Sequence, residues 1–80
     1  MAVIVQFTEL APSDHPRLHP TEVECGWRVD TVPSVGRVLT LETYGSGERA
    51  IPGKVSQSIQ LTEAAATELR ELLQRVFVIE

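Results

Sequence analysis

The sequence has little of what secreted, membrane-bound and catalytic proteins usually need. It contains one cysteine, Cys25, so no disulfide can form within the chain, and a reducing, cytoplasmic compartment is expected. The apolar start at Met1 is short and carries no basic leader, which predicts neither a signal peptide nor a membrane span. No nucleophile and base can be paired by their spacing. We therefore expect neither an enzyme nor a cofactor.

Positive charge is also scarce. Seven Lys and Arg residues stand against eleven Asp and Glu residues, which gives a formal net charge of −4. This balance disfavours a protein that holds a phosphate backbone over its whole surface. The acidic excess lies mainly in the first third and in the C-terminal segment, whereas residues 27–61 are close to neutral. An anionic ligand, if there is one, is expected on that neutral stretch.

The chain is short enough to hold only one small domain, residues 1–80. A core of this size is marginally stable unless a disulfide, a metal or a second copy supports it. Because a disulfide is excluded, we expect a homodimer, which would also protect the edges of a sheet.

The N-terminal third predicts a strand and then a loop. Val3, Val5 and Phe7 alternate with other residues, which predicts a strand within residues 1–10. Residues 11–21 contain three prolines and are predicted to be a loop. The length of this loop predicts that the first strand joins the sheet separately and not as one arm of a tight hairpin.

Residues 22–61 are predicted to form antiparallel strands. From 22 to 32 the apolar side chains alternate with charged ones, which predicts one face in the core and one in solvent. Pro33 to Gly36 form a turn, with glycine able to take a positive φ. The core-facing set is Val23, Cys25, Trp27 and Val29; in the next strand, Val38, Thr40, Glu42 and Tyr44 share a mixed face that is expected to be partly exposed.

Residues 62–77 predict an amphipathic helix. Thr62 is placed to cap it and Glu63 suits its positive end. The apolar stripe consists of Ala65, Leu69, Leu72, Leu73 and Val76. The predicted fold class is therefore α+β: an antiparallel β-sheet of about four strands with one C-terminal α-helix packed on it.

A metal site and a reactive thiol are both disfavoured. His15 and His19 lie near Glu22, Glu24 and Cys25, and imidazole and thiolate suit zinc. The prolines exclude the helix that would bring the two histidines together, so no metal is expected. Cys25 is expected to be a buried structural thiol, and Trp27 is more readily explained by core packing than by ligand stacking.

Tyr44 and the polar loop after it are the candidate ligand contacts. Tyr44 ends a strand beside Gly45-Ser46-Gly47, where its ring could stack on a base or pack across the sheet. Arg49 and Lys54 flank this loop and could hold a phosphodiester, although most such loops are only solvated.

The stretch from about 22 to 77 resembles the positive-cofactor-four family of single-stranded-DNA-binding transcriptional coactivators. The residues that carry the resemblance are Gly36-Arg37-Val38-Leu39, Tyr44, Pro52-Gly53-Lys54, Ile59-Gln60-Leu61 and the helix from Thr62. The resemblance implies a curved four-stranded sheet with one helix, a homodimer formed through the helices, and DNA held across the sheet.

Two hypotheses of function stay open. The first is a small dimeric module that regulates transcription by binding single-stranded nucleic acid through Arg28, Arg37, Tyr44, Arg49 and Lys54. The second is an acidic regulator that docks on a larger protein through its apolar sheet or helix surface, which suits a small chain with this charge.

Overall fold

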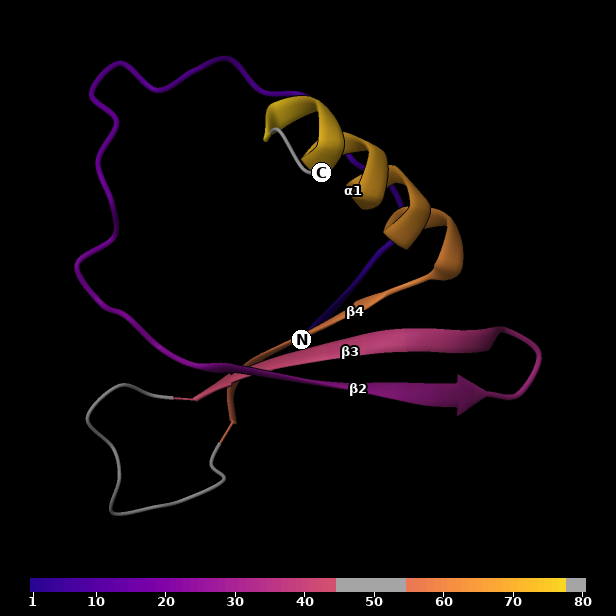
Figure 1. Ribbon diagram of the computed structural model, residues 1–80. Helices are drawn as coiled ribbons and strands as arrows, with labels where there is room; N and C mark the ends of the chain where they lie inside the picture. Colours follow the sequence, from indigo (N-terminus) through magenta and orange to yellow (C-terminus); the bar gives the residue numbers. More distant parts are fainter. Residues whose placement is uncertain (45–54, 78–80) are drawn as a thin grey trace.

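The computed structural model describes residues 1–44 and 55–77 (Figure 1). The predicted contacts Arg49 and Lys54 and the Gly45-Ser46-Gly47 turn lie outside the described residues. The elements are β1 (Ala2–Ile4), β2 (Cys25–Val32), β3 (Gly36–Tyr44), β4 (Val55–Leu61) and α1 (Glu63–Val76). The α+β class is confirmed: one four-stranded sheet is followed by one C-terminal helix.

The sheet is mixed, and the prediction of a purely antiparallel sheet is wrong at its first strand. The strand order is β1-β4-β3-β2, with β2–β3 and β3–β4 antiparallel but β1–β4 parallel. β1 pairs with β4 at the edge opposite β2, so the prediction that it joins the sheet separately and not as one arm of a tight hairpin is confirmed. Residues 5–24 are long enough to carry the chain across the sheet, so no hairpin fixes the direction of β1.

A tight turn joins β2 to β3. The amide of Val35 donates a hydrogen bond to the carbonyl of Val32 at 3.1 Å. Pro33 presets its own φ, and Ser34 follows with a φ of 68°, the positive value that a type II turn requires at its third residue. Gly36 has a φ of 104°, so the predicted positive φ at this glycine is confirmed.

The strand registers divide the β2–β3–β4 surface into two faces. On the apolar face, Trp27 lies opposite Leu41 and Val29 opposite Leu39, while β4 continues these two rows with Ile59 and Leu61. The polar face consists of Arg28, Asp30, Thr40, Glu42 and Gln60, together with Gly26, Val38 and Ser58.

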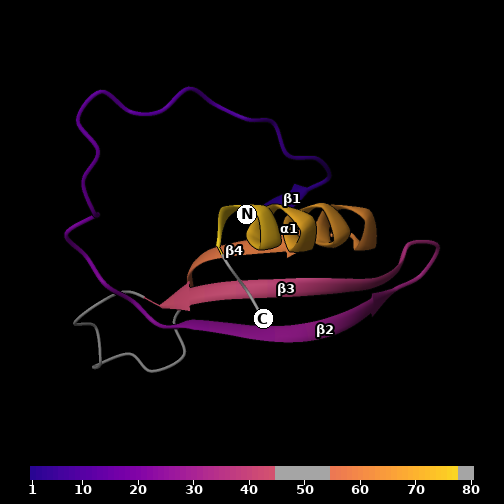
Figure 2. The ribbon, with the colours of Figure 1, turned by 45° about the horizontal axis from the view of Figure 1, so that its top comes forward.

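The helix is capped as predicted and packs through its first half. Thr62 Oγ1 accepts a hydrogen bond from the amide of Ala65 at 3.2 Å, and Ala65 is fully buried. α1 contacts β3 and β4, and Ala66 lines one hollow together with Leu39 and Leu61. The helix begins beside the end of β4 and lies over the sheet (Figures 1 and 2).

The second half of the predicted apolar stripe is not buried. Leu73 is 38% exposed and Val76 is 61% exposed, whereas Leu69 and Leu72 are half-buried. A single short helix covers only part of the sheet, so its C-terminal turns lack a partner element. No helix in the described ranges has the length and the apolar character needed to cross a membrane.

The core of the described chain is very small. Its buried apolar side chains are Val38, Leu61 and Ala65. Residues 8–24 are exposed throughout and form a wide arc away from the sheet (Figure 2). The radius of gyration of 15.1 Å exceeds the value of about 12 Å that a compact chain of this length would have. The protein therefore has less burial than its length allows.

Candidate functional site

Three of the five predicted nucleic-acid contacts lie in the described residues. Arg28 and Tyr44 lie on the polar face, whereas Arg37 pairs with Thr31 at positions that belong to the opposite face. The structure therefore does not bring the three side chains to one surface.

The Tyr44 ring lies against the backbone of β2. A Cβ atom added at Gly26 would lie 2.8 Å from the Tyr44 hydroxyl, so the ring occupies space that only glycine leaves free. Tyr44 is half-buried by this packing. The packing limits how much of the ring could stack on a ligand.

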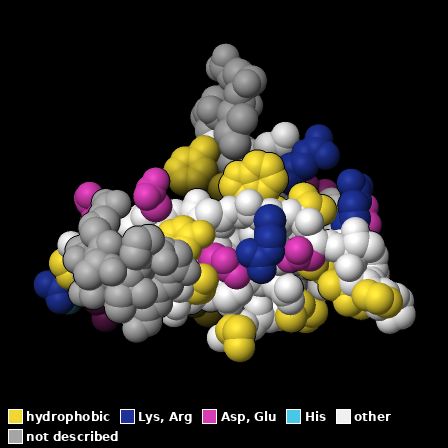
Figure 3. Space-filling view, turned by 90° about the horizontal axis from the view of Figure 1, so that it is seen from below, with side chains coloured by type: hydrophobic (Ala, Val, Ile, Leu, Met, Phe, Trp, Pro, Cys, Tyr) yellow, Lys and Arg dark blue, Asp and Glu magenta, His cyan; other side chains and the backbone are white. Residues whose placement is uncertain are grey.

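Arg28 is held by two carboxylates. Its Nε lies 3.1 Å from Asp30 Oδ2 and its Nη1 lies 3.1 Å from Glu42 Oε1. The hydrogen bond to Glu42, followed by the charges of Asp30 and Glu42, raises the pKa of Arg28. Figure 3 shows a basic side chain flanked by acidic ones in the middle of this surface. A phosphate at Arg28 would have to compete with both carboxylates.

The ion pairs of Arg28 continue into hydrogen bonds at the centre of the sheet, and together they form one polar network. Thr40 Oγ1 donates to Asp30 Oδ2 at 2.7 Å and accepts from Gln60 Nε2 at 3.4 Å. Thr40 is 1% exposed and Val38 is 5% exposed, so the prediction that these two side chains are partly exposed is wrong. Glu42 and Tyr44 are half-buried, in agreement with it. Thr40 can be buried because its hydroxyl both donates and accepts a hydrogen bond.

The apolar face is open at β2. Trp27 is 72% exposed and Val29 is 56% exposed, and Val23 and Cys25 are exposed as well. The predictions that Trp27 and Val29 lie in the core and that Cys25 is a buried thiol are therefore wrong. The reason is that α1 packs on β3 and β4, while β2 is the edge strand furthest from β1. Alternation reveals two faces but not how far across the sheet the helix reaches.

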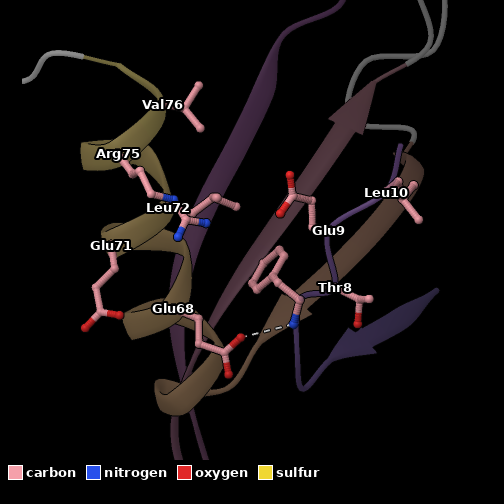
Figure 4. Close-up of a pocket in the computed structure, with 9 residues that line it drawn as sticks. Thr8, Glu9, Leu10, Glu68, Glu71, Leu72, Arg75 and Val76 are labelled. Atoms are coloured by element: carbon pink, nitrogen blue, oxygen red, sulfur yellow. Dashed lines mark hydrogen bonds between the residues drawn. The ribbon is translucent and has the colours of Figure 1, made fainter. Parts of the chain in front are cut away.

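A second hollow lies between the N-terminal segment and α1 (Figure 4). The amide of Phe7 donates a hydrogen bond to Glu68 Oε1 at 3.1 Å. Leu72 points from the helix towards this segment, whereas Glu71 points away from it. This hydrogen bond attaches the N-terminal segment to the helix. We therefore interpret the hollow as part of the packing between the N-terminal segment and α1.

His15 and His19 lie in the exposed arc. The described ranges contain no group of three or more His, Cys, Asp or Glu side chains that could hold a metal ion. Cys25 is a free thiol on the surface of the hairpin.

No family model matches the sequence, and neither the curated proteins nor the solved structures searched contain a match.

Proposed function

We propose that the protein is a small non-enzymatic binding module that docks on a protein partner through the apolar face of β2 and β3. The observation that carries the proposal is the exposure of Trp27 at 72% beside Val29 at 56%. Contiguous apolar side chains that remain in solvent mark interaction sites, and tryptophan is enriched at the centres of interfaces. The net charge of −4 also favours a protein partner over a polyanion.

Single-stranded nucleic acid is the second candidate ligand. The exposed indole of Trp27 offers a stacking platform for a base, and Arg37 is exposed and lies on the same face of the hairpin. The resemblance to the positive-cofactor-four family supports this candidate and, with it, a role in transcription. The two carboxylates around Arg28 weigh against it, because they occupy a cation that would otherwise contact phosphate. The free Cys25 thiol fits the cytoplasmic location that we propose for either function.

The test compares Trp27→Ala with Val35→Ala, since Val35 is also exposed, at 59%, but lies in the turn. Each variant and the unchanged protein are used to capture partners from the source cells, and each is titrated into a labelled oligothymidine at low ionic strength. We expect a partner that Val35→Ala retains and Trp27→Ala loses, with no change in oligonucleotide anisotropy. A partner that Trp27→Ala retains would contradict docking through this face. Oligonucleotide binding that depends on Trp27 would instead establish the second candidate.

A further inference from the structure

The outer edge of β2 is a long, regular strand edge without a partner among the described residues. The strand has eight residues, and its pairing with β3 runs without a register shift. Natural sheets protect such edges with prolines, bulges, very short strands or charged side chains. β2 has none of the first three, and its two charged residues, Arg28 and Asp30, are of opposite sign. The other edge strand, β1, has only three residues. The two edges are therefore unequal, and only β2 offers a full template for pairing.

The side chains of β2 are complementary to those of a second β2 strand that runs antiparallel to it. We propose that two copies of the chain pair through their β2 edges, with Val29 opposite Val29 of the second copy. A two-fold axis perpendicular to the sheet then places apolar face beside apolar face. In this register Arg28 lies opposite Asp30 of the second copy, and the same pair forms again across the axis. Opposite charges at directly facing positions stabilise a sheet.

Neighbouring registers lack this complementarity. A shift of two residues places Arg28 opposite Arg28 in one direction and Asp30 opposite Asp30 in the other. Like charges at facing positions destabilise a sheet. A shift by one residue sets the polar face of one copy beside the apolar face of the other. The register centred on Val29 avoids all three conflicts.

Arg28 and Asp30 are accessible enough to serve in this pairing. Their side chains are 54% and 36% exposed, although each already takes part in the network of its own chain. Pairing would join two four-stranded sheets into one and would place Trp27 and Val29 of both copies on one continuous face. It would also add burial to a chain whose core is small, and oligomerisation is one of the routes by which chains of this size gain stability.

The inference rests on the expected homodimer but not on the ligand of the proposed function. It assigns the interface to β2, whereas the family resemblance implies an interface through the helices. A β2 interface is expected to be sensitive to substitutions in β2, whereas a helix interface is expected to be sensitive to substitutions in α1.

The first experiment measures association by sedimentation at tens of micromolar, an order-of-magnitude range for this purpose. Val29→Lys sets two positive charges at the centre of the proposed interface and should weaken dimerisation by roughly tenfold or more. Val35→Lys, in the exposed turn, is the matched control and should leave the dimer intact. Leu73→Lys tests the helix interface, because Leu73 is 38% exposed on α1. A dimer that survives Val29→Lys and dissociates on Leu73→Lys would overturn the inference and leave the homodimer standing.

The second experiment tests the register. Arg28→Glu alone and Asp30→Lys alone each place like charges opposite each other twice, so both should be monomeric by native mass spectrometry. Mixing the two variants restores opposite charges at both positions, and a heterodimer should form. Circular dichroism of each variant and of the mixture monitors folding, so a chain that folds only in the mixture counts as support. A strictly monomeric unchanged protein, homodimers of either variant, or a mixture without heterodimer would overturn the proposal. Binding of a partner through Trp27 is measured separately and can fail or succeed independently.

Discussion

The two faces of the β2–β3 hairpin differ in exposure: a polar side chain is buried on one face and a large apolar side chain is exposed on the other, the reverse of the usual arrangement. On the polar face, Thr40 is 1% exposed because a network of Asp30, Gln60 and Arg28 covers it, although Arg28 and Asp30 themselves reach solvent. The apolar face is open at β2, where Trp27 is 72% exposed. The difference shows that burial here follows position in the sheet more than side-chain polarity. Thr40 lies on a central strand between two neighbours, whereas Trp27 lies on an edge strand beyond the reach of the helix.

The largest expected effect separates the covered part of the apolar face from the open part. Leu61 is 2% exposed beneath α1, and Leu61→Ala should lower the free energy of unfolding by about 2–5 kcal/mol. Val29→Ala, on the same face but 56% exposed, should cost less than about 1 kcal/mol in the monomer. Urea denaturation of the dilute protein measures both. Equal losses for the two variants would show that the apolar face is covered along its whole width.

A smaller effect is expected at the centre of the polar face. Thr40→Ala removes the hydroxyl that donates to Asp30 and accepts from Gln60, and it leaves a small void. Because these partners are part-buried, the cost should be about 1–3 kcal/mol. Thr31→Ala, at an exposed position of β2, is the control and should change the stability little. If the two variants unfold at the same denaturant midpoint, the network does not stabilise the polar face.

The smallest effect is expected at the turn that joins the two strands. Ser34 has a φ of 68°, a conformation that glycine adopts without steric cost. Ser34→Gly should therefore raise the free energy of unfolding by about 0.5–1 kcal/mol. Ser58→Gly, within β4, should lower it, since glycine weakens a strand interior. Thermal unfolding followed by circular dichroism measures both. A loss of stability in Ser34→Gly would mean that the serine side chain contributes a contact that outweighs the backbone strain.

The local elements of this fold could be predicted from the sequence because their signals are local. Thr62 and the stripe that follows it predict α1, and alternation around Pro33 and Gly36 predicts the β2–β3 hairpin. The parallel pairing of β1 could not be predicted, since three residues joined by a long segment specify neither a neighbour nor a direction. Such pairing is decided by contacts distant in sequence.

The candidate site was predicted less well for a related reason. Alternation places Trp27 and Arg28 on opposite faces but does not say that β2 is an edge strand. The register that brings Glu42 to Arg28 is likewise a cross-strand property, so the loss of a free cation was not visible in the sequence. The residue types did hold one signal: a tryptophan in a strand with three flanking acidic residues, Glu22, Glu24 and Asp30, is compatible with an exposed edge.

The most direct test of the open apolar face uses the intrinsic fluorescence of the protein. The sequence contains one tryptophan and one tyrosine, so excitation at the red edge of the absorption, where tyrosine does not absorb, makes the emission report Trp27 alone. At about 1 μM, a concentration at which weak self-association is negligible, acrylamide quenching is compared between the native protein and the urea-unfolded chain. The account predicts a red-shifted native emission that acrylamide quenches nearly as efficiently as in the unfolded chain. A blue-shifted emission that is strongly protected from acrylamide would contradict it, because Trp27 would then be buried within the monomer.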